Sequence, residues 1–179
     1  MKLIIVLASM INIAYAASGG ISGGGGNVVS PTAPTALQDP REIRSIIKGS
    51  KELLYKFISA KYALFKTGSM DADDLRMYSV LFADNEMNLH EVMEEIKLDI
   101  PIDQACFDQK GREYDGSTFN TKTNTVCISA FTIAKKVDMF EVPVQATALV
   151  LHEFSEVAGL SDEDAISLQL EVIDELKNW

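Results

Sequence analysis

The stretch LHEFSEVAGLSDED, residues 151–164, concentrates residue types that bind metal ions and move protons. Residues four apart on an α-helix lie about 40° apart around its axis, so His152 and Glu156 should point the same way. Gly159 suits the left-handed conformation that ends a helix, and a chain that turns back there would bring Asp162 toward the same point. One imidazole and two carboxylates, with a fourth position open to water, would form the usual arrangement of a catalytic zinc site.

This spacing resembles the extended motif of zincin metallopeptidases, HExxHxxGxxH or HExxHxxGxxD. Four positions of the second form are matched, by His152, Glu153, Gly159 and Asp162. Glu156 stands where the second histidine of the motif belongs. The order of elements before the motif, a short strand and then an apolar helix, is also similar to the zincin core.

The resemblance implies that His152 and Asp162 are metal ligands. It implies that Glu153 is the general base that takes a proton from a zinc-activated water. Glu156 would be the second ligand, since a carboxylate can bind zinc at about 2.0–2.2 Å. An anion in place of a neutral imidazole reduces the net positive charge of the metal, so the water would be acidified less. The replacement predicts a slower hydrolase, a different metal preference or no enzyme, and oxygen ligands favour manganese, magnesium or calcium.

The function expected from this resemblance is that of a secreted metallopeptidase-like protein, which hydrolyses peptide bonds through a metal-activated water. Two alternatives stay open. The chain could keep a zincin-like fold without catalysis, as an exported binding or structural protein, or the motif could be a chance match on an unrelated helical domain. The cofactor would be zinc, manganese or another divalent cation, or none. The substrate or partner would be a peptide or a protein.

The HExxE string occurs twice, because residues 90–94 read HEVME. This copy has no glycine three positions later and no matching apolar segment before it. His90 and His152 are the two histidines of the sequence, and each begins the same string. Both strings could be solvated helix faces of an acidic chain. Alternatively, the two helices could build a site of two histidines and two carboxylates, although carboxylate-bridged metal pairs use the spacing Glu-x-x-His.

Cysteine usage is consistent with export. The chain has two cysteines, Cys106 and Cys127, and in an oxidising compartment an even pair favours a disulfide. Closing this loop would stabilise the fold by about 3 kcal/mol in the chain-entropy model. Two free thiols and a metal-binding pair are the alternatives, but neither cysteine has a histidine neighbour at metal-ligand spacing.

The N-terminus also predicts export. Residues 1–16 combine a positive start, an apolar core too short to span a bilayer, and small residues at Ala14 and Ala16. This is the pattern of a signal peptide cleaved after Ala16, with a retained membrane anchor as the alternative. Residues 17–38 are rich in glycine, serine and proline, which predicts a flexible linker before a single domain at residues 39–179. The protein would then be secreted or periplasmic.

The net charge narrows the range of partners. The chain has a formal net charge of −10, and no basic stripe is interleaved with aromatic residues. An acidic protein repels phosphate backbones, which disfavours nucleic acid as a partner. No segment after the signal peptide is apolar enough to cross a membrane, so we expect no membrane association after cleavage.

Hydrophobic periodicity predicts an α+β domain, mainly helical with a small antiparallel sheet, and the resemblance adds a zincin-like active-site helix. Helices are expected at residues 39–66, 71–82, 85–95, 131–137, 143–158 and from residue 162 onward. Strands are expected at residues 96–103 and 125–129. Residues 104–124 between them are expected to form a polar connection, with turns at Lys110-Gly111 and Asp115-Gly116.

Overall fold

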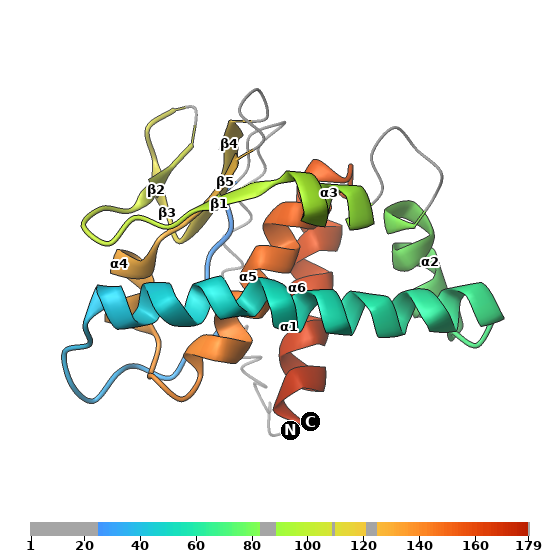
Figure 1. The fold of residues 1–179 in the computed structure, drawn as a ribbon, viewed down its shortest axis with the longest axis horizontal. Coiled ribbons are helices and arrows are strands. Elements are labelled where there is room, and N and C mark those ends of the chain that lie inside the picture. Colours follow the sequence, from blue (N-terminus) through green and yellow to red (C-terminus); the bar gives the residue numbers. More distant parts are fainter. Residues whose placement is uncertain (1–24, 83–88, 109, 121–124, 179) are drawn as a thin grey trace, which may run out of the picture.

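The computed structural model describes residues 25–82, 89–108, 110–120 and 125–178. The predicted signal peptide and the first part of the predicted linker lie outside the described residues. In chain order the elements are α1 (Pro40–Thr67), α2 (Ala72–Leu81), α3 (Leu89–Glu95), β1 (Lys97–Asp99), β2 (Cys106–Phe107), β3 (Glu113–Tyr114), β4 (Gly116–Asn120), β5 (Thr125–Ile128), α4 (Ala130–Lys136), α5 (Val142–Val157) and α6 (Asp162–Lys177). Figure 1 shows α1 lying across α5 and α6, with the strands at one end of the molecule.

The predicted helices are present, except that residues 85–88 of the helix predicted at 85–95 lie outside the described residues. Capping residues explain where two of them begin and end. The Asp39 carboxylate accepts a hydrogen bond from the Arg41 N–H at 2.9 Å, which caps α1. Gly68 ends α1 in the left-handed conformation, with φ 65°. At α6 the Ser161 hydroxyl plays the capping role, because it accepts from the Asp164 N–H at 3.2 Å.

The main sheet is mixed, so the expectation of an antiparallel sheet was wrong. β5 is the central strand and pairs parallel with β1 and antiparallel with β4. The connection over residues 100–124 contains β2, β3 and β4, and this length lets the chain return and run in the direction of β1. β1 is shorter than the strand predicted at residues 96–103. Pro101 has no N–H for a ladder, and its carbonyl accepts from the Ala130 N–H at 3.0 Å instead.

The polar connection predicted at residues 104–124 holds three of the strands. Gly111 adopts φ 75°, and the Asp108 carboxylate accepts hydrogen bonds from the backbone N–H groups of Lys110 and Arg112. These contacts close the short antiparallel hairpin of β2 and β3 around the predicted Lys110-Gly111 turn.

The second predicted turn, Asp115-Gly116, is only partly present, because the chain bends at Asp115 but Gly116 already belongs to the next strand. Gly116 begins β4 and pairs with Ile128 of β5. Asp115, Ser117 and Thr118 are all buried, with exposures of 0%, 0% and 7%. β4 therefore buries small and polar residues rather than an alternating apolar set, and strand periodicity in the sequence could not reveal it.

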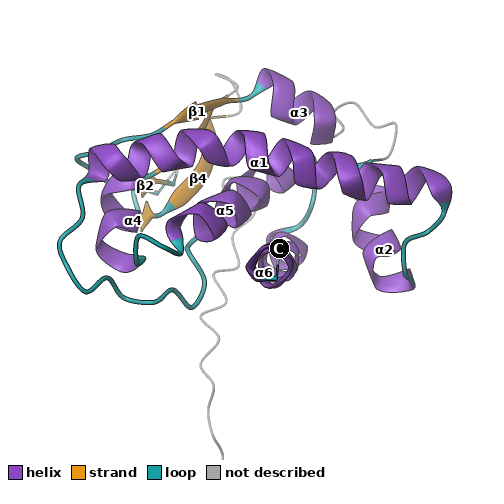
Figure 2. Ribbon diagram, turned by 60° about the horizontal axis from the view of Figure 1, so that its bottom comes forward, coloured by secondary structure: helices purple, strands orange, loops and turns teal. Residues whose placement is uncertain are grey.

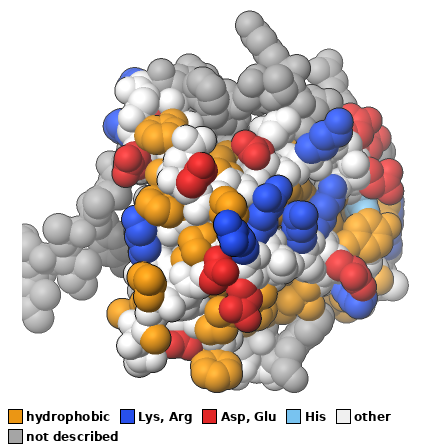
Figure 3. Space-filling model, turned by 60° about the vertical axis from the view of Figure 1, so that its left-hand side comes forward, with side chains coloured by type: hydrophobic (Ala, Val, Ile, Leu, Met, Phe, Trp, Pro, Cys, Tyr) orange, Lys and Arg blue, Asp and Glu red, His pale blue; other side chains and the backbone are white. Residues whose placement is uncertain are grey.

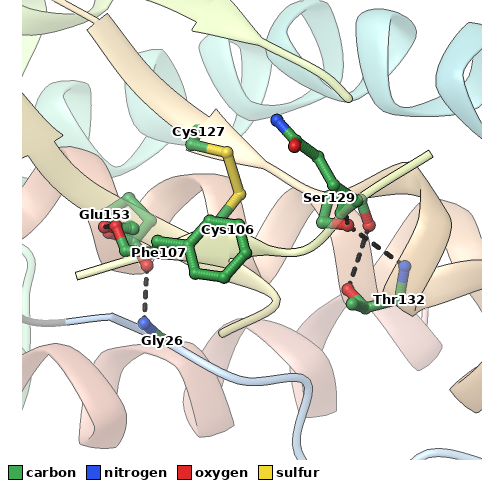
Figure 4. The surroundings of a disulfide bond; sticks show 9 residues. Gly26, Cys106, Phe107, Cys127, Ser129, Thr132 and Glu153 are labelled. Carbon is green, nitrogen blue, oxygen red and sulfur yellow. Dashed lines mark hydrogen bonds between the residues drawn. A yellow bond between two sulfur atoms is a disulfide. The ribbon is translucent and has the colours of Figure 1, made fainter. Parts of the chain in front are cut away.

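Cys106 and Cys127 form the predicted disulfide, which joins β2 to β5. Figure 4 shows this disulfide next to Phe107, and Glu153 of α5 is drawn in the same surroundings. The covalent link therefore fixes the hairpin against β5, the strand that leads into α4.

The structure differs from the linker predicted at residues 17–38 over residues 25–29, whereas most of residues 30–38 are exposed. Residues 25–29, here called the N-terminal segment, pack against the domain. Val28 is 8% exposed and belongs to the hydrophobic core, and the Gly26 carbonyl accepts from the Gly116 N–H at 2.9 Å. The prediction considered only side chains that could be buried, whereas this segment is held mainly through its main chain.

Helix α5 lies at the centre of the molecule. Its residues are buried around almost the whole circumference, and it packs against α1, α6, β4 and β5. Figure 2 shows α1 above α5, with α6 seen end-on beside them. Polar side chains of α5 therefore face protein rather than water. Within the described residues, no helix has both the length and the hydrophobicity needed to cross a bilayer.

A buried ion-pair cluster attaches the C-terminal half of α6 to the first two helices. Lys61 is 7% exposed, and its Nζ lies 3.0 Å from Asp74, 3.1 Å from Glu171 and 2.6 Å from Glu175. Burial opposes the charge of Lys61, but the hydrogen bonds that its ammonium donates to the three carboxylates outweigh this effect and raise its pKa. One cation therefore balances carboxylates from α2 and α6.

The charged side chains are unevenly distributed over the surface. On the face drawn in Figure 3, lysine and arginine side chains gather near the middle, with acidic and hydrophobic side chains around them. This local excess of positive charge contrasts with the formal net charge of −10.

Candidate metal centre

The turn between α5 and α6 determines where the predicted ligands meet. Gly159 adopts φ 97°, a conformation that favours glycine. The Leu160 N–H donates to the Ser155 carbonyl at 2.9 Å, which closes the end of α5. Because α6 begins shortly afterwards, Asp162 occupies its first position and lies beside the last turns of α5.

The structure brings His152, Glu156 and Asp162 together, as the sequence predicted. One ligand atom from each lies within 4.8 Å of the others. His152 is 1% exposed, and neither of its ring nitrogens makes a hydrogen bond of good geometry among the described residues, although the Ala165 backbone lies close enough to raise its pKa. Its Nε2 lies 3.6 Å from Asp162 Oδ1, which is too far for a hydrogen bond. Buried polar atoms are nearly always satisfied, so this imidazole requires an explanation.

The electrostatics of the site favour the binding of a cation. Burial, and then the neighbouring Asp162, raises the pKa of Glu156 to about 7. Burial, and then Glu156, raises the pKa of Glu153 well above its usual range. Burial lowers the pKa of His152 against the opposing effect of Asp162, which favours the neutral imidazole that binds metals. In the described part of the chain, no lysine or arginine forms a salt bridge with these carboxylates.

The donor set fits a divalent cation. Imidazole nitrogen and carboxylate oxygen are ligands of zinc and manganese, and a cation would reverse the cost of placing acidic groups together. Glu156 and Asp162 are only partly buried, and the Asp162 side chain is 26% exposed, so the cluster has a side that reaches solvent. The Thr118 hydroxyl of β4 donates a hydrogen bond to Glu156 Oε2 at 3.4 Å.

Glu153, the predicted general base, lies between two glycines. Its Oε1 accepts a hydrogen bond from the Gly26 N–H at 2.7 Å, which Figure 4 shows. A Cβ added at Gly26 would lie 2.8 Å from this oxygen, and a Cβ added at Gly116 would lie 2.6 Å from it. The second carboxylate oxygen, Oε2, is buried without a hydrogen-bond partner among the described residues. Only glycine at both positions leaves room for the carboxylate.

Sequence reasoning missed both glycines. Gly26 was assigned to the linker, and Gly116 was assigned to a turn. Their role depends on two segments that meet α5 from distant parts of the chain, and no local pattern in either segment marks that contact.

The second HExxE string lies in a different environment. His90, on α3, packs edge-on against the rings of Tyr55 and Tyr62, at centroid distances of 5.8 and 5.2 Å. Its Nε2 is buried without a hydrogen-bond partner in the described residues, whereas Glu94 is exposed. Within the described ranges, His152, Glu156 and Asp162 are the one group with metal-ligand geometry. His90 is therefore half-buried among aromatic rings, and it does not belong to the group that could hold a metal ion.

Comparison with protein-family models, with curated proteins and with solved structures finds no match to this chain. The functional interpretation therefore rests on the motif and on the geometry of the site.

Proposed function

We propose that this chain is an exported metallopeptidase-like protein, in which His152, Glu156 and Asp162 hold a divalent cation. The observation that carries the proposal is the burial of His152 beside two carboxylates, with both ring nitrogens unpartnered. An empty hydrogen-bond position on a buried imidazole costs about 1–3 kcal/mol, and a metal ligand role accounts for that cost. Export is inferred from the predicted signal peptide, and the disulfide is consistent with it.

Glu153 is proposed as the general base. A bound zinc or manganese ion would supply a Lewis acid that lowers the pKa of a water molecule. Gly26 holds one oxygen of Glu153, which leaves Oε2 to accept a proton. Burial raises the pKa of Glu153 well above its usual range, which strengthens this carboxylate as a proton acceptor.

Glu156 in the second ligand position determines which metal is preferred. Two carboxylates and one imidazole form a harder and more anionic ligand set than two imidazoles and one carboxylate. We therefore expect manganese to compete with zinc more effectively than at a site with two histidines. Glu156→His should shift the preference toward zinc and increase any zinc-dependent peptidase activity.

The test begins with metal content. Protein with its disulfide intact, freed of metal by chelation and then titrated with zinc and with manganese, should bind one ion per chain. Glu153→Gln should keep the metal and lose hydrolysis of a quenched fluorescent peptide library. Absence of stoichiometric binding of either ion would refute the metal centre, and hydrolysis by metal-loaded Glu153→Gln would refute the role of Glu153.

A second function is favoured by a separate observation. Glu153 is 0% exposed and lies against the Gly26 main chain, so a substrate could not reach it in this conformation. A non-catalytic exported binding protein with a zincin-like site would show this closure. Metal binding without hydrolysis, in the wild type and in Glu156→His alike, would support this second function over the first.

A further inference from the structure

The N-terminal segment lies against Glu153, the proposed general base. The Gly26 N–H donates to Glu153 Oε1 at 2.7 Å, and the Gly26 carbonyl accepts from the Gly116 N–H at 2.9 Å. Two residues later, the Val28 N–H donates to Asp115 Oδ2 at 3.1 Å. The segment is therefore bound on one side by β4 and on the other by α5.

Two buried glutamines bind the rest of its main chain. Gln145 Oε1 accepts from the Val29 N–H at 3.3 Å, and its Nε2 donates to the Val29 carbonyl at 2.9 Å. Gln169 Nε2 donates to the Asn27 carbonyl at 3.0 Å. With the segment in place the two glutamines are 0% and 1% exposed, and its main chain satisfies their side-chain amides.

We propose that this surface of β4, α5 and α6 is a peptide-binding site, and that the N-terminal segment occupies it as an intramolecular ligand. The reason is that these contacts use peptide groups, which any extended peptide carries. The inference rests on the proposed function only for the fate of a bound peptide, because the binding itself requires no metal.

Side-chain contacts define the class of peptide. Glycine is required at the position of Gly26, because a Cβ there would lie 2.8 Å from His152 Cδ2 and 2.9 Å from Leu149 Cδ1. An apolar residue is required two positions later, where Val28 enters the core. The intervening residue, Asn27, is exposed and can vary. The ligand class is therefore an extended peptide of the form Gly-x-Val.

The tether gives the N-terminal segment an advantage over a free peptide. A short flexible connection produces an effective concentration in the millimolar range, so a free peptide must be at comparable concentration to displace the segment. We therefore expect the wild type to bind an added peptide poorly, and a variant with a displaced segment to bind it well.

The first test uses Gly26→Val in the full chain, with Gly49→Val as the matched control, because a Cβ at Gly49 meets no atom within 4 Å. The probe is a fluorescent peptide with the sequence of residues 25–32, GGNVVSPT, added to metal-free protein. Gly26→Val should bind it with a Kd at least about tenfold lower than the wild type or Gly49→Val. The peptide GVNVVSPT should not bind. Equal binding by all three proteins, or no binding to folded Gly26→Val at about 1 mM peptide, would overturn the proposal.

A second variant decides the question if Gly26→Val does not fold. A site-specific protease sequence is inserted between Ala36 and Leu37, where Leu37 is 98% exposed. After cleavage, non-covalent contacts alone hold the N-terminal fragment, and an excess of GGNVVSPT should replace it while the circular dichroism spectrum is retained. A fragment that resists about a 100-fold excess, or a domain that unfolds when the fragment leaves, would make the segment an integral part of the fold.

These outcomes separate the two proposals. Loss of the metal centre would leave peptide exchange unchanged, because the probe is measured without metal. Failure of peptide exchange would leave the metal titration of the intact chain unchanged.

Discussion

The chain contains the HExxE string twice, and the two copies differ in everything except spacing. The copy on α5 is buried, and its histidine and second glutamate meet Asp162 within 4.8 Å. The copy on α3 directs its histidine into a group of aromatic rings and its second glutamate to solvent. Helical spacing puts two side chains on one face, but a third group from another element makes that face a site. For the copy on α5 the third group is Asp162 of α6, which the left-handed turn at Gly159 brings back toward α5.

The largest expected difference between the two copies is in metal affinity. His152→Asn removes a proposed ligand and should raise the Kd for zinc by more than about 100-fold, since loss of even an outer-shell partner costs about 10–100-fold. His90→Asn should leave the Kd within about twofold of the wild type, because His90 lies outside the group of ligand atoms. Competition with a chromophoric chelator measures both values. Equal affinities for the two folded variants would show that the copies do not differ in function.

A smaller difference is expected in the pH dependence of stability. The folded-state pKa of Glu156, about 7, lies above the ordinary value of 4.5. The stability that its protonated form contributes is therefore fully present below about pH 4.5 and is lost as pH rises through 7. Metal-free wild type should lose up to about 2 kcal/mol of unfolding free energy between pH 5 and pH 8.

The matched pair of variants for this experiment is Glu156→Gln and Glu94→Gln. Glu156→Gln should flatten the decline, because an amide cannot ionise. Glu94 is exposed, so Glu94→Gln should change the unfolding free energy by no more than about 0.5 kcal/mol at either pH. Urea unfolding in the presence of a chelator provides the measurement. An undiminished decline in Glu156→Gln would assign the effect to other groups.

The smallest expected difference concerns the metal-free stability of leucine variants. His152→Leu removes two buried unpartnered nitrogens and should raise the unfolding free energy by about 1–2 kcal/mol. His90→Leu removes one such nitrogen but also its contacts with Tyr55 and Tyr62, so its effect should be about 1 kcal/mol or less. Thermal unfolding with a chelator compares them. A strong destabilisation by His152→Leu would mean that the imidazole already has a stabilising role without metal.

The sequence predicted the parts of this molecule that depend on local rules. Caps at Asp39 and Ser161, and the turn at Gly159, were correct because each depends on a few neighbouring residues. The convergence of His152, Glu156 and Asp162 followed from helical spacing and that single turn. The Cys106–Cys127 disulfide was also correct, because only one pairing was available.

Other features could not be predicted because they depend on contacts between distant segments. The direction of β5 relative to β1 depends on the path of a long connection, which periodicity does not encode. β4 lacks apolar alternation, because its small and polar residues make room for Glu153. The N-terminal segment resembled a linker because its composition gives no sign of the partners that bind its main chain.

Helix α6 has a cluster of acidic groups at each end. Near its C-terminus, the carboxylates of Asp74, Glu171 and Glu175 surround the ammonium of Lys61. Its first residue, Asp162, joins Glu153 and Glu156 at the other cluster, where no ammonium or guanidinium of the described residues forms a salt bridge with them. The acidic cluster near the C-terminus of α6 therefore has its countercharge within the folded chain. At the other end the described residues supply no countercharge, so a bound cation would determine how firmly the start of α6 is held against α5.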